Sequence, residues 1–572
     1  MTVDKKQKGK GFAGGLTNYG DRDFSLYLRR SFASSMGYSR EMLERPIVGI
    51  ANSASGFNNC HRHFPEMIEA VKRGVLAAGA LPIEFPTISL GEVFLNPTSL
   101  KFRNLMSIDV EEMARAQPID ALVLVGGCDK TVPAQLMGAA SANIPAIQLV
   151  AGPMSTSRHR GERLGACTDC RKFWARYRAG DVSDEGIDDV EKRLASTSGT
   201  CAVMGTASTM AAIAETLGMM PSGSAAIPAI DADRLRVSEE TGRIAVSLIG
   251  SDRTPRRIMT EKAFENAVRV LMAIGGSTNA IIHLAAIAGR LGLRIDLKRM
   301  NDISNSTPVL VDLKPTGAFY MEDLHAAGGI PAVLRELKHL LHLDCETITG
   351  ETIGERIASA DAWVDNDVVR PFTDPIRTNG GLVALFGNLA PRGAIMKRSA
   401  ADPSLFEKSG RAVVFSSLQD LASRIDDAAL DVLPDDFLVL QNAGPVSEAA
   451  MPEAGYIPIP SKLARAGVKD MVRISDARMS GTAYGTIVLH VAPDAASGGP
   501  LGLVHNGDRI SLSVSKQTIS LDVSEEELAK RARDVHVRPK DPIRGYDRLY
   551  REHILQADEG CDFDFLQSLS TQ

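Results

Sequence analysis

The segment Ile119-Asp-Ala-Leu-Val-Leu-Val-Gly-Gly-Cys-Asp-Lys130 decides the fold. Its first seven residues, apolar except for Asp120, form a run of the length expected for a buried strand. Two glycines follow and allow close approach of the backbone to another group. The run then ends in Cys128, Asp129 and Lys130, a thiol, a hard oxygen ligand and an amine. This order predicts a strand that delivers reactive side chains at its carboxyl end.

Two other apolar runs have the same form. Pro46–Ala51 leads into the loop from Asn52 to Cys60, and Phe85–Leu90 ends at Gly91-Glu92. A helix is predicted from Pro65 to about Ala78, with an inner face of Met67, Ile68, Val71, Val75 and Leu76. Strands alternating with helices are typical of a parallel sheet covered on both faces, where ligands bind beyond the carboxyl ends of the strands. We therefore expect one crevice to contain Cys60, Glu92, Cys128, Asp129 and Lys130.

The chain is predicted to have two domains. The Pro/Gly/Asn-rich stretch 369–381 interrupts the alternation. We expect an α/β domain over 1–375 and a β-rich, barrel-like, swivelling domain over 376–572. The strands expected in the second domain are Val413–Ser416, Phe437–Leu440, Val472–Ser475 and Thr486–Val491, followed by a hairpin or meander over Arg509–Val523.

Composition narrows the class of protein. The 572 residues are 44% hydrophobic and 23% charged with a net charge of -6, typical of a folded globular protein without the basic stripe of a nucleic-acid binder. No apolar run approaches the ~20 residues of a membrane span, and the basic N-terminus lacks the apolar segment of a secretory signal. A cytoplasmic location is expected. Seven scattered cysteines, an odd number, argue against a disulfide framework.

Cys167 and Cys170 form the most obvious cysteine motif, a CxxC pair. The pair is consistent with a redox dithiol or half of a zinc site, so a redox or zinc-binding protein is one hypothesis from a different class. No second pair completes a zinc site, and we expect Cys167 to contribute neither to a cluster nor to turnover. Taken alone, Cys128 is equally consistent with a buried structural cysteine. Cys201 precedes a helix of small residues, where an anionic group or tight packing is equally plausible.

Three segments together carry a family resemblance. Gly127-Cys-Asp-Lys130, Gly275-Gly-Ser-Thr-Asn-Ala280 and Ser475-Asp-Ala-Arg-Met-Ser-Gly-Thr482 resemble signature segments of the dihydroxy-acid and sugar-acid dehydratase family. The resemblance implies a 2Fe-2S cluster bound by Cys60, Cys128 and Cys201. Three protein ligands leave one iron position free for substrate, as a Lewis acid requires.

The same resemblance implies a magnesium ion bound by Glu92, Asp129, Glu453 and a carbamylated Lys130. Carbamylation would turn a repelling cation into an oxygen ligand. Ser480 matches the serine that removes the C2 proton. Thr482, Ser277, Thr278 and Asn279 are candidate substrate contacts, with helix capping as their structural alternative. His283 is as consistent with a core histidine.

The expected reaction is loss of water across C2 and C3 of a sugar acid, such as L-arabinonate or D-xylonate, giving a 2-keto-3-deoxy acid. Segments 447–453 and 475–484 look more like the pentonate branch than the branch of branched-chain amino acid biosynthesis. Dihydroxy-acid dehydratase is the principal alternative. The phosphogluconate branch, with a 4Fe-4S cluster, is a further one. The family also implies a homodimer or homotetramer.

Overall fold

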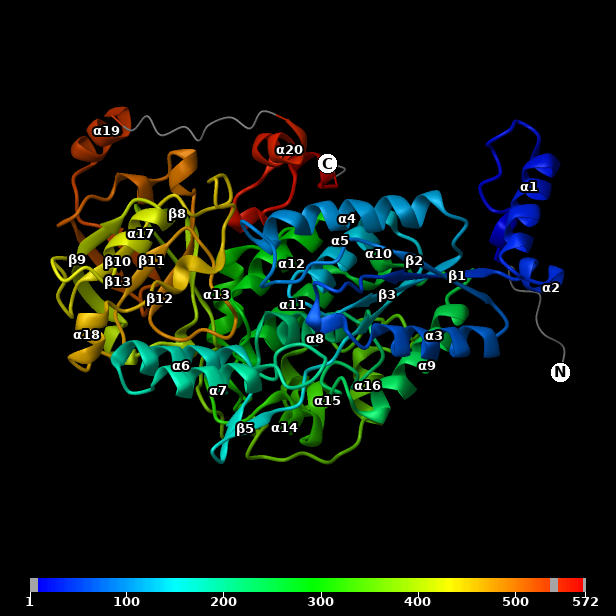
Figure 1. The fold of residues 1–572 in the computed structure, drawn as a ribbon, viewed down its shortest axis with the longest axis horizontal. Helices are drawn as coiled ribbons and strands as arrows, with labels where there is room; N and C mark the ends of the chain where they lie inside the picture. The colour runs from blue at the N-terminus through cyan, green and yellow to red at the C-terminus, as the bar shows by residue number, and fades with distance from the viewer. Residues whose placement is uncertain (1–8, 535–543, 569–572) are drawn as a thin grey trace.

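A computed structural model describes residues 9–534 and 544–568. Figure 1 shows two parts, an α/β part at the centre and a barrel beside it, and a short N-terminal arm containing α1 (Arg22–Ser35) and α2 (Arg40–Leu43) that extends from the α/β part. In the described residues, no helix combines the length and apolarity that crossing a membrane requires.

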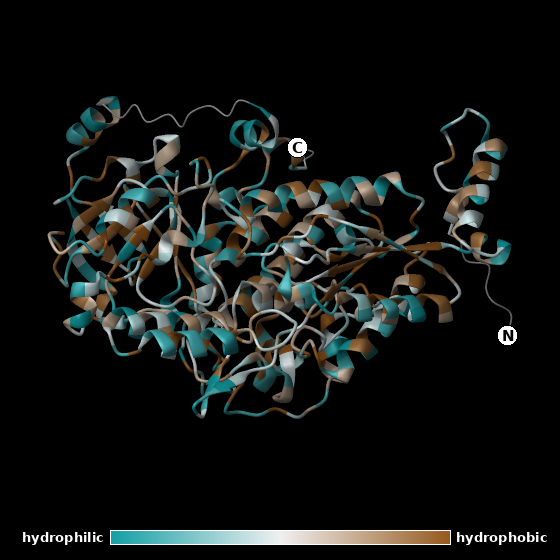
Figure 2. Ribbon diagram, viewed as in Figure 1, coloured by the Kyte–Doolittle hydropathy of each residue, from teal (hydrophilic) through white to brown (hydrophobic). Residues whose placement is uncertain are grey.

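The α/β part is built on four parallel strands in the order β2-β1-β3-β4. Their bounds are β1 Ile47–Asn52, β2 Leu81–Pro86, β3 Ala121–Gly126 and β4 Ala146–Val150. One face is covered by α4 (Ser99–Ala116) and α5 (Thr131–Ala142), the other by α3 (Phe64–Ala77) and α9 (Ala232–Ser247) (Figure 1). The predicted parallel sheet with helices on both faces is confirmed. Figure 2 shows hydrophobic residues along its strands and hydrophilic ones on outer helices such as α19 (Glu525–Asp534).

Two local predictions are wrong. The second strand covers 81–86, whereas we predicted 85–90, so residues 87–90 belong to the loop that leads to Glu92. Leu76 lies on the outer face of α3 with 42% of its surface exposed. Leu76 lies one turn after Lys72 and Arg73 on the outer face of the helix, whereas its neighbour Val75 is buried.

Beyond β4 the chain is mainly helical and adds a further layer next to α5. In α8 (Thr206–Thr216) all eleven residues are buried, because it packs among α5, α11 (Glu261–Ala273) and α12 (Asn279–Arg290). The remaining helices of this layer are α10 Pro255–Ile258, α13 Leu297–Asn305, α14 Met321–Ala326, α15 Gly329–Leu337 and α16 Ile353–Ser359.

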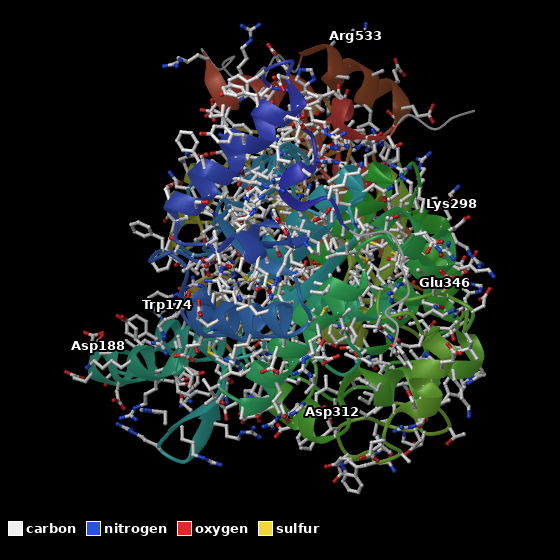
Figure 3. The ribbon with its side chains drawn as sticks, turned by 90° about the vertical axis from the view of Figure 1, so that its right-hand side faces the viewer. Trp174, Asp188, Lys298, Asp312, Glu346 and Arg533 are labelled. Carbon is white, nitrogen blue, oxygen red and sulfur yellow. The ribbon has the colours of Figure 1, made fainter. Side chains whose placement is uncertain are left out.

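An excursion between β4 and α8 forms a small unit of its own. It contains the two-stranded sheet of β5 (Ser157–His159) and β6 (Glu162–Leu164), followed by α6 (Cys167–Ala179) and α7 (Asp184–Leu194). Trp174 and Asp188 mark its outer margin in Figure 3. The first turn of α6 points back into the molecule, as described below.

The second part is a closed eight-stranded barrel of mixed direction, ordered β10-β11-β12-β8-β7-β14-β13-β9. Its strands are β7 Val383–Gly387, β8 Ala390–Met396, β9 Glu407–Phe415, β10 Phe437–Leu440, β11 Arg473–Ser475, β12 Ile487–Ala492, β13 Arg509–Ser513 and β14 Thr518–Leu521. The β-rich second part and the hairpin of β13 and β14 are confirmed. Sequence patterns did not predict β7 and β8.

The C-terminal segment returns to the α/β part. After α20 (Gly545–His553), Asp562 forms a fully buried ion pair with Arg290 of α12. Arg103 of α4 donates to the carbonyl oxygens of Gly560 and Cys561 at 2.7 Å. The C-terminal segment therefore contacts both α4 and α12 and links these two helices.

Candidate active site

Three carboxylates meet where the barrel faces the carboxyl ends of the sheet strands. Glu92, Asp129 and Glu453 each offer one oxygen, and these oxygens lie within 4.8 Å of one another. Glu92 follows β2 and Asp129 follows β3, whereas Glu453 lies in the loop after β10. The two parts of the chain therefore contribute to one acidic cluster. The prediction that Glu92 and Asp129 lie close together is confirmed.

Lys130 lies inside this cluster. Its fully buried amine donates to Glu92 Oε2 at 3.0 Å and lies 3.7 Å from Asp129 Oδ2. Burial raises the pKa of Asp129 to about 6, the charge of Lys130 opposes the rise, and the charges of Glu92 and Glu453 add to it. Burial is the largest of these effects, so the neighbouring cations do not restore the ordinary pKa of Asp129.

Arg478 holds the two parts together around the cluster. Its guanidinium, 1% exposed, donates to Glu92 Oε1 at 3.1 Å, to Glu453 Oε1 at 2.6 Å and to Thr98 Oγ1 at 2.7 Å. Burial alone would raise the pKa of Glu92, but the charges of Lys130 and Arg478 outweigh burial and lower it to about 2. Glu92 is therefore ionised at any pH at which the protein works.

The first pair of predicted cluster ligands, Cys60 and Cys128, lies beside the carboxylates. A hydrogen bond with Cys128, together with burial, raises the pKa of Cys60 well above its usual value, and the charges of Cys201 and Asp129 act in the same direction. The backbone N–H of Cys128 donates to His61 Nε2 at 2.9 Å. Burial lowers the pKa of His61 to about 3, so this ring is neutral and can accept. His61 thus fixes the backbone that presents Cys128.

The third predicted ligand, Cys201, has an unexpected neighbour. Its Sγ donates to Cys167 Sγ at 3.6 Å. This hydrogen bond raises the pKa of Cys201 and lowers that of Cys167, and the charge of Asp129 reaches both thiols. From sequence we expected Cys167 to contribute neither to a cluster nor to turnover, and that expectation stays a prediction. In the structure Cys167 begins α6 and its thiol contacts Cys201, whereas Cys170 is exposed.

Ser480 lies in the loop between β11 and β12, enclosed by both parts of the chain. Its Oγ lies 2.8 Å from Thr482 Oγ1. The carbonyl oxygen of Thr482 accepts from Thr168 Oγ1 of α6 at 3.0 Å. A Cβ at Gly481 would lie 2.6 Å from the amide nitrogen of Thr206, so glycine lets this loop rest on the amino end of α8. The positive end of that helix therefore faces the loop that holds Ser480.

Lys397 approaches the same loop from the barrel. It follows β8 directly, has 0% exposed surface, and donates to the carbonyl oxygen of Gly481 at 3.5 Å. Burial lowers its pKa to about 7. Among the described residues, no carboxylate forms an ion pair with it. An isolated buried amine beside a reactive loop is a candidate functional group.

The candidate substrate contacts are buried next to this loop. Ser277 Oγ lies 2.9 Å from Thr206 Oγ1, and Asn279 Nδ2 donates to the same oxygen at 3.2 Å. Thr278 Oγ1 and Asn279 Oδ1 have no hydrogen-bond partner among the described residues. Helix capping does not explain Thr278, because its side chain forms no cap hydrogen bond at the start of α12. His283 Nδ1 accepts a hydrogen bond from Arg103 Nη1 at 3.1 Å, and its Nε2 is unpaired among the described residues.

Sequence comparison identifies the chain. A model of the dihydroxy-acid/6-phosphogluconate dehydratase N-terminal domain matches residues 45–356, and the C-terminal model matches residues 367–561. The chain belongs to this dehydratase family. It is therefore a hydro-lyase. The alternative hypothesis, that the chain is a redox or zinc-binding protein built on Cys167 and Cys170, assigned it to the wrong class of protein.

Three relatives span nearly the whole dehydratase. The 6-deoxy-6-sulfo-D-gluconate dehydratase of Pseudomonas putida is 45% identical over 95% of this chain and 94% of its own. The L-arabinonate dehydratase of Rhizobium leguminosarum bv. trifolii is 44% identical over 96% of this chain and 95% of its own. The dihydroxy-acid dehydratase of Halothermothrix orenii is 37% identical over 93% of this chain and 97% of its own.

The residues present fit the metals that the resemblance implies. Oxygens around one octahedral magnesium ion lie about 3–4 Å apart, so carboxylate oxygens within 4.8 Å need only a small contraction. The ammonium of Lys130 opposes a cation there unless it is modified. The thiols are free of disulfides, as iron ligation requires.

Three residues of this site escaped the reasoning from sequence. Arg478 was quoted only as part of a motif, although an arginine next to a predicted magnesium ligand set is itself a signal of charge pairing. Lys397 follows an apolar run, and because many surface lysines do the same, its sequence context does not show that it is buried. The position of Cys167 had no local signal, because its contact with Cys201 spans 34 residues of chain.

Proposed function

We propose that the chain dehydrates a sugar acid of the aldonate class, removing water across C2 and C3 to give a 2-keto-3-deoxy acid. One observation carries the proposal: the thiol set and the carboxylate set share one site, since the charge of Asp129 acts on Cys60, Cys201 and Cys167. Two different metal-binding sets this close suit a substrate that must be held at one carbon and cleaved at the next.

Ser480 is the proposed base that takes the C2 proton. A serine hydroxyl is a weak base at neutral pH, so its anionic form needs neighbouring positive charge. The amino end of α8 and the amine of Lys397 both approach Gly481, the residue after it. Thr482 Oγ1, 2.8 Å from Ser480 Oγ, can donate a hydrogen bond to the anion. These groups together favour the deprotonated serine.

The two metals have separate tasks. A 2Fe-2S cluster held by Cys60, Cys128 and Cys201 would supply a Lewis acid for the departing C3 hydroxyl. Magnesium held by Glu92, Asp129, Glu453 and Lys130 as its carbamate would offset charge at the substrate carboxylate and the C2 oxygen. Carbamylation is testable by nuclear magnetic resonance after incubation with isotope-labelled bicarbonate.

Polar groups around the loop favour a polyol substrate. Thr278 Oγ1, Asn279 Oδ1 and His283 Nε2 are buried without partners among the described residues. Burying such atoms costs free energy unless a ligand or water pairs with them. The hydroxyls of an aldonate could form hydrogen bonds with these atoms, whereas the alkyl end of a branched dihydroxy acid could not. The named arabinonate and sulfogluconate relatives, which are more similar than the dihydroxy-acid dehydratase, support the same choice.

A panel assay tests the proposal. Anaerobically purified protein with magnesium should form 2-keto-3-deoxy product from arabinonate or xylonate faster than from gluconate, 6-deoxy-6-sulfogluconate and 2,3-dihydroxyisovalerate. The protein should be brown and contain iron and sulfide. Preference for dihydroxyisovalerate would overturn the substrate class. Colourless protein that turns over without iron would overturn the cluster.

A further inference from the structure

The site contains four thiols in two pairs. Cys60 hydrogen-bonds with Cys128, and Cys201 with Cys167 at an Sγ–Sγ distance of 3.6 Å. The proposed cluster uses three of these thiols. Cys167 is therefore a fourth thiol, close to the cluster and without a role in the proposed function.

The spacing of the second pair matches ligation of a single metal ion. Two thiolates bound to one tetrahedral metal ion at about 2.3 Å lie about 3.8 Å apart. The observed 3.6 Å is close to this value. A 2Fe-2S cluster bound by four thiolates has two on each iron. Cys201 with Cys167 would supply both thiolates of one iron, and Cys60 with its neighbour Cys128 those of the other.

The surroundings of Cys167 favour its thiolate form and fix its position. Cys167 is the first residue of α6, a helix of 13 residues whose amino end stabilises negative charge. The next residue, Thr168, is tied to the carbonyl oxygen of Thr482, which places Cys167 between the thiols and the Ser480 loop.

We propose that Cys167 is the fourth thiolate ligand of the cluster in the substrate-free enzyme, bound to the same iron as Cys201. The proposal rests on the proposed function, because it requires the cluster. When substrate arrives, the bond between Cys167 Sγ and iron is exchanged for a bond to the substrate C3 hydroxyl oxygen. The released thiolate takes up the proton of that hydroxyl, and no electron is transferred. A closed cluster in the resting enzyme would resist loss of iron to oxygen.

Alkylation of the intact holoenzyme tests this exchange. Under argon, iodoacetamide should modify Cys167 slowly in the cluster-loaded enzyme without substrate, and several-fold faster once the preferred aldonate is added or the cluster is removed. Cys170, exposed on the same helix, is the matched control and should react equally in all three states. Peptide mass spectrometry measures both. Equal reactivity of Cys167 in loaded and cluster-free enzyme would overturn the proposal.

Variants provide a second measurement. Cys167→Ser and Cys167→Ala should keep the iron and sulfide content of the wild type but change the visible and reduced electron paramagnetic resonance spectra, and should lose the cluster in air several-fold faster. Cys170→Ser should match the wild type in each respect. Unchanged spectra and air stability in both Cys167 variants would refute fourth-ligand status while leaving the dehydratase intact. Absence of iron from the wild type would instead refute the proposed function.

Discussion

Replacing Lys397 with methionine tests whether its buried amine serves the reaction. Burial lowers its pKa from the usual 10.5 to about 7. Such a shift corresponds to about 5 kcal/mol against folding once the amine of the unfolded chain is fully protonated. The nearest acceptor, the carbonyl oxygen of Gly481 at 3.5 Å, is too distant to offset this. Lys397 therefore lowers the free energy of unfolding. A residue that destabilises the fold in this way is a candidate for a role in function.

The destabilisation caused by Lys397 should depend on pH in one direction. The pKa is lower in the folded chain, so the folded chain binds the proton less tightly than the unfolded chain. The destabilisation is absent above pH 10.5, grows as the pH falls, and is constant below about pH 7. Lys397→Met should therefore stabilise the protein about 3–4 kcal/mol more at pH 7 than at pH 10. Scanning calorimetry at the two pH values measures the difference.

Activity should change in the opposite direction. Removing a cation near Ser480 should lower kcat roughly a hundredfold. Lys516→Met, at the exposed turn of the barrel hairpin, is the control and should change neither stability nor rate. A Lys397→Met enzyme with full turnover, or one less stable at pH 7 than the wild type, would refute the reasoning.

Three other perturbations test the site. Ser480→Ala should keep the brown colour and iron content while kcat falls roughly 10²–10⁴-fold; full turnover in this variant would exclude Ser480 as the base. Because burial raises the pKa of Asp129 to about 6, magnesium must displace a proton below that pH, and its dissociation constant should rise roughly tenfold per pH unit from pH 6 downward. Titration calorimetry checks this, and a pH-independent affinity would contradict it. Arg478→Met leaves Glu92 and Glu453 without their shared partner and should cost about 3–5 kcal/mol in the metal-free protein. Thermal denaturation measures this loss, and an unchanged midpoint would show that the arginine is dispensable.

The sheet was predictable because its inner strands are buried on both faces. Such strands appear in sequence as continuous apolar runs, and β1 and β3 are runs of this kind. β2 is different because it lies at the edge of the sheet, where Glu84 and Pro86 are exposed. Its sequence lacks a continuous apolar run, which explains why the predicted strand was displaced toward residues 85–90.

The proximity of the four cysteines was predictable only in part. Strand ends explain why Cys60 and Cys128 meet, because parallel strands finish at one edge of a sheet. Cys201 and Cys167 belong to no strand end. They meet because the excursion of residues 155–195 folds back, so that α6 points its first turn into the molecule. Sequence periodicity indicates which face of a helix or strand is buried. It gives no information about where a segment such as residues 155–195 folds back onto the rest of the chain.

The division of the site between the two parts of the chain has a consequence for catalysis. The α/β part supplies the four thiols, Glu92 and Asp129, whereas the barrel supplies Glu453, Ser480 and Lys397. Ser480, the proposed base, and the third carboxylate therefore reach the thiols only when the barrel is docked. Contacts that span that junction close to the chemistry include those of Arg478 with Glu92 and Thr98 and that of Thr168 with Thr482. Since Thr168 adjoins Cys167, displacement of the barrel would disturb the base and the fourth thiol together. Release of Cys167 and positioning of Ser480 are thus expected to be coupled through one turn of α6.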